Sequence, residues 1–311
     1  MGNTYVGDRS AIKIDIETVS GVYQAPTIVL PLEKGAGVWE PALDKDEANP
    51  IAANHGSKET TLITAFASVS ASSKMKLPSD HTLVAAAFEC CGVVGTAITS
   101  VGTGYAYDSA KKSTASMLQM GERKSTLVYG ARSDFGLVCE IGKAAEISFD
   151  FKSTLKEVVQ LDSGDADNTI PDTPGFEKVF MTKDCAAYLV NGNTAHFKKV
   201  AFNLGAEVVV PKDTCSGAAY TKDIKPELQV TMSVTEDNED AFIDLKSGTE
   251  FNFVIPLFDV HGVEKWQLIA PKCVVIDQKT PVNEGRIDVD RTLECRKTAG
   301  DDNWELRAIH A

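Results

Sequence analysis

The side chains that most often carry chemistry are scattered along this 311-residue chain without the spacing of a catalytic or metal site. Its five histidines form neither H-x-x-x-H nor H-E-x-x-H, the spacings that present two imidazoles to one metal ion. The sequence also lacks G-x-S-x-G, G-x-x-x-x-G-K-[ST] and a G-x-G-x-x-G after a strand, which are patterns of hydrolases and phosphate-binding loops. We therefore expect no enzymatic activity, no metal ion and no cofactor.

Two groups of carboxylates come closest to forming a site. Asp165-Ala166-Asp167-Asn168 resembles the start of a calcium-binding loop, but the glycine and the distal glutamate of an EF-hand are missing. Asp288 and Asp290 share one face of a predicted strand, whereas a glycosidase needs carboxylates on both sides of a bond in a cleft. We interpret both groups as solvated acidic surface, with a cation at the first as the alternative.

The cysteines do not indicate a disulfide-rich or zinc-binding protein. There are seven of them, an odd number, and no pair has C-x-x-C spacing. They are Cys90, Cys91, Cys139, Cys185, Cys215, Cys273 and Cys295. We expect reduced, mostly buried thiols that pack as small hydrophobic side chains. The N-terminus has no basic segment followed by an apolar run, so we expect a cytoplasmic protein without a signal peptide.

Composition excludes further function classes. The net charge of −13 argues against a dedicated DNA-binding protein, which needs clustered Lys and Arg for the phosphate backbone. Hydrophobic residues make up 43% of the chain, which is too many for a disordered protein. No apolar run approaches the ~18 residues of a membrane-spanning helix. A globular protein of one large domain or two modest ones remains.

Alternation of apolar and polar residues is the dominant pattern, and it predicts strands with one buried and one solvated face. In the range 12–17 it places the isoleucines on one face and the charged residues, including Glu17, on the other. The other predicted strands cover 60–71, 124–130, 135–141, 145–152, 197–210, 228–234, 249–258, 264–276 and 287–290. Turns are expected at 102–105, 191–192 and 259–262.

Helices are predicted to be few and short. One runs from Ser79 or Asp80 to about Cys91, and a second from about Glu239 to Lys246, each ended by a glycine. The many short strands indicate an all-β fold of two packed antiparallel sheets, as a sandwich or barrel. The range 31–58 lacks periodicity, and 157–177 turns polar after a strand end, so we expect long loops there.

We predict one domain over residues 1–311 with insertions at 31–58 and 157–177. Two lobes, at about 1–160 and 175–311, are the alternative.

Several segments, in their order along the chain, resemble the tail tube proteins of long-tailed bacteriophages. They are the helix at 83–92, the range 127–142 with its Gly130-Ala131-Arg132 turn, the Ile-x-Phe-x-Phe alternation at 147–151, and the strands at 197–208, 224–231 and 269–273. The sequence departs from the family pattern at Ala206, where Asn is common, and at Lys143-Ala144. The part after Ala299 is unmatched.

The resemblance implies a structural protein. Tail tube proteins fold as two packed antiparallel sheets with a helix against them. Six subunits form a ring in which their strands close one barrel, and the rings stack into a hollow tube. The implied partners are further copies of the chain, the tape-measure protein, the tail terminator, baseplate or tip proteins, and genome DNA in transit without specific binding. No membrane partner is implied, and the location is the virion tail, assembled in the host cytoplasm.

The resemblance and the alternation together select candidate site residues. Polar residues on the wet faces of two predicted strands are candidates for lining the lumen: Glu146, Ser148, Asp150, Gln229, Thr231 and Ser233. Residues of the two loop ranges are candidates for contacts between rings or subunits: Trp39, Asp44, Asp46, Asp162, Asp165 and Asp167. An acidic or neutral lumen favours sliding of DNA, because binding requires cationic contacts.

Two other functions stay open. The first is another ring-forming tail component, such as a terminator, a baseplate hub, or the tube of a tailocin or gene transfer agent. The second is an unrelated β-sandwich binding module or hydrolase, which needs a concave pocket with convergent polar groups. Many copies per particle would identify a tube, whereas saturable binding of a small ligand without a polymer would identify a binding module.

Overall fold

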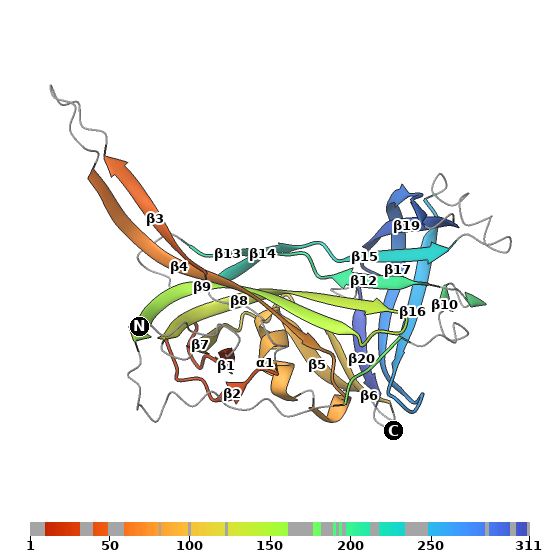
Figure 1. Cartoon of the computed structure of the whole chain (residues 1–311), viewed down its shortest axis with the longest axis horizontal. Helices are drawn as coiled ribbons and strands as arrows, with labels where there is room; N and C mark the ends of the chain where they lie inside the picture. The colour runs from red at the N-terminus through yellow and green to blue at the C-terminus, as the bar shows by residue number, and fades with distance from the viewer. Residues whose placement is uncertain are drawn as a thin grey trace, which may run out of the picture.

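The computed structural model consists almost wholly of antiparallel strands, which confirms the all-β prediction (Figure 1). It describes residues 10–31, 40–48, 59–80, 82–98, 101–121, 124–160, 177–181, 189–190, 193–194, 197–211, 218–233, 248–283, 286–298 and 303–309.

Within the described residues, the helices η1 and α1 both lie in the first half of the chain. Its elements are β1 (Ser10–Ile16), β2 (Ile28–Val29), β3 (Glu40–Ala48), β4 (Glu59–Lys74), the 3-10 helix η1 (Pro78–Asp80), α1 (Thr82–Cys90), β5 (Val93–Ile98), β6 (Gly102–Tyr107), β7 (Ala115–Gly121), β8 (Lys124–Glu140) and β9 (Glu146–Gln160). The second half contributes β10 (Leu189–Val190), β11 (Asn193–Thr194), β12 (Lys199–Asn203), β13 (Ala206–Val209), β14 (Tyr220–Ile224), β15 (Glu227–Ser233), β16 (Glu250–Phe258), β17 (Glu264–Lys279), β18 (Val282–Asn283), β19 (Arg286–Cys295) and β20 (Glu305–Ile309).

One curved sheet forms the first layer of the molecule. Its strands pair in the order β3, β4, β9, β8, β12, β15, β19, β17, so strands from both sides of residue 160 belong to the same sheet. The outer parts of β3 and β4 leave the body as a hairpin, seen at the upper left of Figure 1. In the sequence, β13 and β14 lie between β12 and β15; they form a hairpin that is a separate two-stranded sheet.

The second layer is attached through two long strands that each change partner along their length. The first half of β8 pairs with β7, which continues to β1 and β2, while the second half of β8 pairs with β12. Likewise the first half of β17 pairs with β20, which continues to β6 and β5, while its second half pairs with β19. The two layers are therefore joined in one continuous strand ladder rather than two separate sheets.

Aromatic side chains fill the space between the layers. Phe88 of α1 lies 5.0 Å from Phe135 of β8 and 5.8 Å from Tyr105 of β6, measured between ring centroids. Trp304, just before β20, lies 4.7 Å from Phe202 of β12 and is 1% exposed. Phe135 and Phe202 belong to the curved sheet, and Tyr105 and Trp304 to the second layer. Burial of these rings against one another therefore stabilises the packing of the layers.

The predicted helix is confirmed. α1 follows η1 and buries Val84, Ala87 and Phe88 against the sheet. Gly92 ends it with φ +77°, a conformation that residues with a Cβ rarely adopt, and its N–H donates to the carbonyl of Glu89 at 3.0 Å. The second predicted helix, at 239–246, lies outside the described residues.

A β-bulge interrupts β8 at the Gly130-Ala131-Arg132 segment. Tyr129 pairs with Thr154 and Arg132 with Lys152, so β8 holds one more residue here than β9 does. Gly130 has φ +63°, which removes its N–H and C=O from the ladder. We predicted two strands, 124–130 and 135–141; that was wrong, because the bulge bends one continuous strand without ending it.

A buried carboxylate holds this bulge. Glu17 is 7% exposed, and its Oε1 accepts hydrogen bonds from the Gly130 N–H at 2.7 Å and the Ser116 hydroxyl at 2.8 Å. Its Oε2 accepts from the Thr114 hydroxyl at 2.6 Å and the Gly21 N–H at 2.7 Å. We predicted Glu17 on the solvated face of its strand; the prediction was wrong because β1 ends at Ile16 and the chain turns the carboxylate inward.

Two other expectations were wrong. The range 102–105 is part of β6 rather than a turn, and a Cβ on Gly104 would lie 2.1 Å from Oε1 of Glu305 on β20, so glycine serves close strand packing.

The range 31–58 is not wholly a loop, because it includes β3. β9 extends to Gln160, and the part of the second expected loop at 161–176 lies outside the described residues. Asp259 caps the expected turn at 259–262, accepting from the N–H groups of His261 and Val263.

We expect Glu17→Ala to lower the free energy of unfolding by about 3–5 kcal/mol, because it leaves buried donors without an acceptor. Urea denaturation followed by circular dichroism measures this. Glu157→Ala, on an exposed position of β9, is the matched control and should change stability little. An equal, small effect of both substitutions would show that the bulge does not depend on Glu17.

Candidate functional site

The side of the curved sheet that faces away from the aromatic core carries a mainly polar surface, interrupted by the exposed Val138. Cross-strand pairing places one row of side chains across it in the order Lys74, Glu146, Val138, Ala201, Gln229, Thr292 and Asp277. The intervening residues, such as Ile147, Leu137 and Val200, are buried on the core side. We call the surface defined by this row, and by the residues two positions along each strand, the polar face.

The structure brings together the lumen candidates whose side chains it describes. Glu146, Ser148 and Asp150 on β9 and Gln229 and Thr231 on β15 all lie on the polar face, although β8 and β12 separate the two strands. Asp150 and Gln229 are exposed, and the others are half-buried.

The last lumen candidate, Ser233, is the final residue of β15, where its backbone pairs with Asp288; its side chain lies outside the description. Whether this face lines a channel remains a prediction.

Carboxylates outnumber cationic side chains on the polar face. The carboxylates are Asp134, Glu140, Glu146, Asp150, Glu227, Asp277, Asp290 and Glu294, and the lysines are Lys74, Lys152, Lys199 and Lys279. Some of them neutralise each other: Lys74 Nζ lies 2.5 Å from Glu146 Oε2. By this count the described residues of the face are slightly acidic, and the cations that gather there, Lys199, Lys279 and Arg291, lie beside Asp277 and Asp290.

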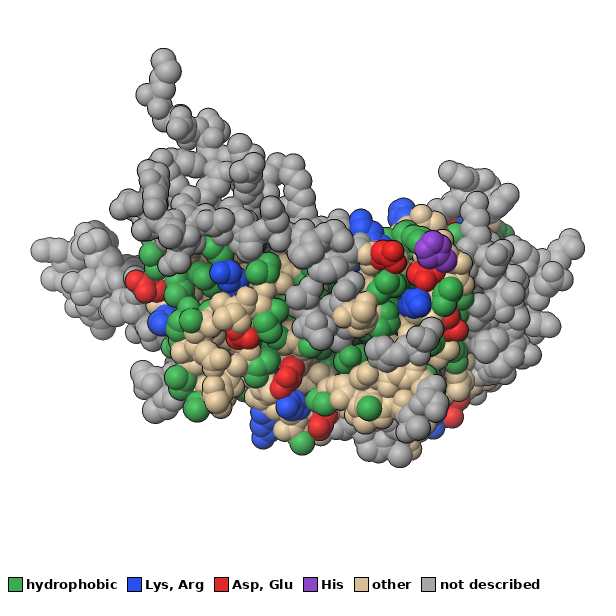
Figure 2. Space-filling model, turned by 90° about the horizontal axis from the view of Figure 1, so that it is seen from below, with side chains coloured by type: hydrophobic (Ala, Val, Ile, Leu, Met, Phe, Trp, Pro, Cys, Tyr) green, Lys and Arg blue, Asp and Glu red, His purple; other side chains and the backbone are tan. Residues whose placement is uncertain are grey.

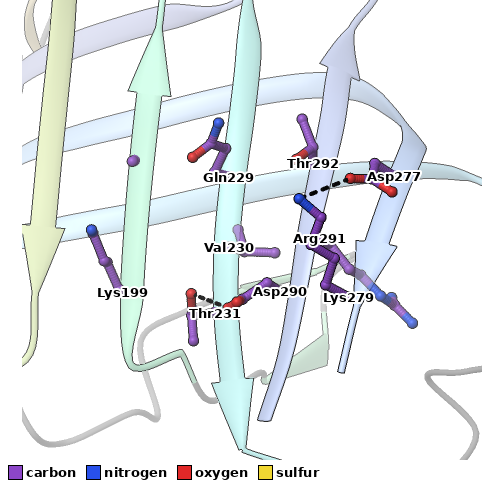
Figure 3. Close-up of a pocket in the computed structure, with 10 residues that line it drawn as sticks. Lys199, Gln229, Val230, Thr231, Asp277, Lys279, Asp290, Arg291 and Thr292 are labelled. Carbon is purple, nitrogen blue, oxygen red and sulfur yellow. Dashed lines mark hydrogen bonds and ion pairs between the residues drawn. The ribbon is translucent and has the colours of Figure 1, made fainter. Parts of the chain in front are cut away.

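A groove of about 300 Å³ opens on the polar face over β12, β15, β19 and β17 (Figure 3). Polar side chains from all of these strands line it, among them Lys199, Gln229 and Lys279. The Thr231 hydroxyl donates to Asp290 Oδ1 at 2.6 Å across its floor, and Lys279 Nζ lies 3.8 Å from Asp277 Oδ2.

The two aspartates predicted to be solvated differ from each other. Asp290 is half-buried in the groove, whereas Asp288 is 2% exposed and its Oδ1 lies 2.6 Å from Lys198 Nζ. The prediction was wrong for Asp288, because the ion pair compensates the charge that the sheet buries. The proposed calcium loop at 165–168 lies outside the described residues. Within the described residues, no three His, Cys, Asp or Glu side chains are grouped as a metal site.

The β13–β14 hairpin covers part of the polar face near β8 and β9. Asp134 Oδ1 accepts hydrogen bonds from the N–H groups of Ala206 and Phe135 at 2.9 and 2.8 Å, and Lys152 Nζ donates to the Val208 carbonyl at 3.2 Å. Burial under the hairpin raises the pKa of Asp134. The chain enters the hairpin at Gly205, whose φ of +64° turns it out of the sheet.

Among the candidates for contacts between rings, Asp44 and Asp46 lie on β3, in the hairpin that projects from the body (Figure 1). Their backbone pairs with Thr64 and Thr61 of β4, and their side chains lie outside the description. Trp39, Asp162, Asp165 and Asp167 lie outside the described residues altogether.

Sequence reasoning missed the contributions of β12 and the end of β17 to the site. Lys199 begins a strand that was predicted, but the alternation alone does not say which strand it pairs with. Asp277 and Lys279 lie beyond the predicted end of their strand at residue 276. The pairing register shifts between Val275 and Asp277, and the apolar–polar alternation stops there, so the sequence pattern does not extend to them.

Figure 2 shows the molecule from below, where apolar side chains are scattered among polar and charged ones over the described part. In the part of the chain that the structure describes, no helix is long and apolar enough to cross a membrane. No protein-family model matches this chain, and no curated protein is significantly similar to it in sequence.

We expect Asp134→Asn to raise the free energy of unfolding at pH 7. Asn keeps the oxygen that accepts from Ala206 but removes a charge that burial disfavours. The pKa of Asp134 is raised in the folded state, so its ionisation lowers the free energy of unfolding as the pH rises through the folded-state pKa. This loss of stability disappears below the ordinary Asp pKa of about 3.9, where the carboxyl group is protonated in both states.

Urea denaturation of both proteins at several pH values tests this. The two stability curves should converge as the pH falls toward 4. Asp223→Asn, at an exposed position of β14, is the control and should produce no such convergence. A lower stability of Asp134→Asn at pH 7 would contradict the burial argument.

Proposed function

We propose that this chain is the structural subunit of a bacteriophage tail tube, in which six copies form a ring and the rings stack into a conduit for DNA. The observation that carries the proposal is the polar face. Residues selected from two distant parts of the sequence as lumen candidates lie on one mainly polar surface of a curved sheet.

The charge of that face suits a conduit better than a binding site. A surface that holds DNA releases counterions through clustered lysines and arginines. Here carboxylates outnumber the lysines, and Lys74 is already paired with Glu146. DNA would therefore pass such a surface without specific contacts.

Unpaired strand edges support assembly with further copies. Residues 69–74 of β4 pair with β9 on one side, and no described strand pairs with them on the other. β3 likewise has β4 as its only strand partner within the described ranges. Strand edges without a strand partner favour association unless another segment covers them. The Pro31 carbonyl accepts from the Ser73 hydroxyl at one point of the β4 edge, and closing a barrel from several subunits would pair the rest.

The projecting β3–β4 hairpin suits contacts between stacked rings. Stacking identical rings is a heterologous association that no symmetry operation closes, so it requires a part of each subunit to reach its neighbour. The hairpin reaches beyond the body and carries the candidates Asp44 and Asp46. The tape-measure, terminator and baseplate or tip proteins would be the further partners, in a virion tail assembled in the host cytoplasm.

Electron microscopy of the purified full-length protein tests this proposal. We expect negative-stain images of hollow tubes with a regular axial repeat. Single rings that never stack would identify a terminator or hub instead. Monomers over a wide concentration range, together with absence of the chain from virions in many copies, would refute the tube.

We expect Gln229→Cys in assembled tubes to react with a small maleimide, and to be protected when DNA fills the channel. Gln229 is exposed on the polar face, whereas the control, Val260→Cys, is in the β16–β17 turn at a position 60% exposed. Both variants carry Cys185→Ala and Cys215→Ala, which removes the two cysteines outside the described residues. The remaining native cysteines are buried and should not react with the maleimide. Labelling of Gln229→Cys that ignores DNA would place the polar face outside the channel.

The groove favours a second candidate, a β-sandwich module that binds a small polar ligand. Its volume of about 300 Å³ is at the lower end for ligand sites, and polar groups converge on it, although its lining is more polar than that of most such sites. Saturable binding of a ligand by a protein that forms no polymer would support this function, and tubes in the micrographs would argue against it.

A further inference from the structure

Cys273 and Cys295 lie opposite each other on adjacent strands, near the point at which the pairing of β17 changes from β20 to β19. Cys273 of β17 pairs with Cys295 of β19, and their sulfur atoms lie 3.7 Å apart. Cys273 is fully buried and Cys295 is 3% exposed. The other cysteines of the described residues, Cys90, Cys91 and Cys139, are also free and buried, but none of them lies opposite another across a strand pair.

The backbone geometry at this pair suits a covalent bond between the sulfurs. The Arg296 N–H donates to the Lys272 carbonyl at 2.8 Å, and the Cys295 N–H points the other way, to the Pro226 carbonyl at 2.9 Å. Cys273 and Cys295 therefore form a non-hydrogen-bonded antiparallel pair. Such pairs have Cα atoms about 4.5 Å apart, within the range that a disulfide spans.

We propose that Cys273 and Cys295 form a disulfide site that links β17 to β19 when the protein meets an oxidant of the disulfide class, such as oxidised glutathione. The Cys295 thiolate attacks glutathione disulfide and releases one glutathione thiol. The Cys273 sulfur then loses its proton and displaces the second glutathione. Both cysteines are oxidised, and one glutathione disulfide is reduced to two thiols.

The order of attack follows from the positions of the two residues. Cys295 is the last residue of β19, so fraying of the strand end exposes it first. The Cys273 thiol donates its hydrogen to Cys295, and this bond together with burial raises the pKa of Cys273. Cys273 is thus the resolving thiol, and the reaction is slow because it requires local opening.

The inference does not rest on the proposed function. For a tail subunit, however, the site would let the chain fold with free thiols in a reducing cytoplasm and acquire the link in a particle outside the cell. The link would fix the corner at which the polar face meets the second layer.

The test uses the full-length protein with Cys185→Ala and Cys215→Ala, which removes the thiols outside the described residues. Reduced protein is incubated with oxidised glutathione, alkylated, digested without reductant and analysed by mass spectrometry. We expect one linked peptide pair that contains Cys273 and Cys295. We also expect the thermal midpoint to rise on the order of 5 °C and to return after reduction.

Matched variants separate the link from general thiol effects. Cys139→Ala removes a buried thiol that has no cysteine partner and should keep the oxidation-dependent shift. Cys295→Ala should abolish the shift, while its stability under reducing conditions reports any packing loss separately. Retention of both thiols after prolonged oxidation, a link between other cysteines, or a fall in the thermal midpoint would each overturn the proposal.

Discussion

The bulge at Gly130-Ala131-Arg132, held by the Glu17 carboxylate, is the constraint on which the architecture depends. A strand without it would keep one set of neighbours along its whole length. The extra residue in β8 changes the local twist, so the strand pairs with β7 before the bulge and with β12 after it. The backbone groups displaced from the ladder are satisfied elsewhere, since Gly130 donates to Glu17 and accepts from the Ala219 N–H.

The same bond network connects the bulge to the polar face. Ala219 directly precedes β14, so the carbonyl of Gly130 anchors the hairpin that covers Asp134. A single carboxylate, that of Glu17 directly after β1, thereby helps to position elements on both sides of the sheet. The aromatic cluster around Phe88 and Trp304 then stabilises the packing of the layers, because burying the apolar surface of large rings is favourable.

Sequence alone predicted the elements whose pattern is local. The alternation in β9 and β15, and the capped apolar face of α1, depend on side chains that follow one another along the chain. β5 and β6 were missed because their glycines serve close packing against side chains of other strands, such as Glu305 of β20, which is distant in sequence from Gly104. The polar side chains of the candidate site were visible individually. Their common face was not, since it depends on the pairing of β12 with both β8 and β15.

The last strand has a consequence for how the chain folds during synthesis. β8 and β9 are adjacent in sequence and can pair as soon as both have left the ribosome, and so can β5 and β6. The second partner of β6, β20, is made only at the end of the chain. Phe88 of α1 can cover Phe135 early, but the ring of Trp304, 4.7 Å from Phe202, is added only at the end of synthesis. Nascent chains therefore expose an apolar surface until translation is nearly complete. Such an apolar surface makes the unfinished chain more prone to aggregation than the finished protein.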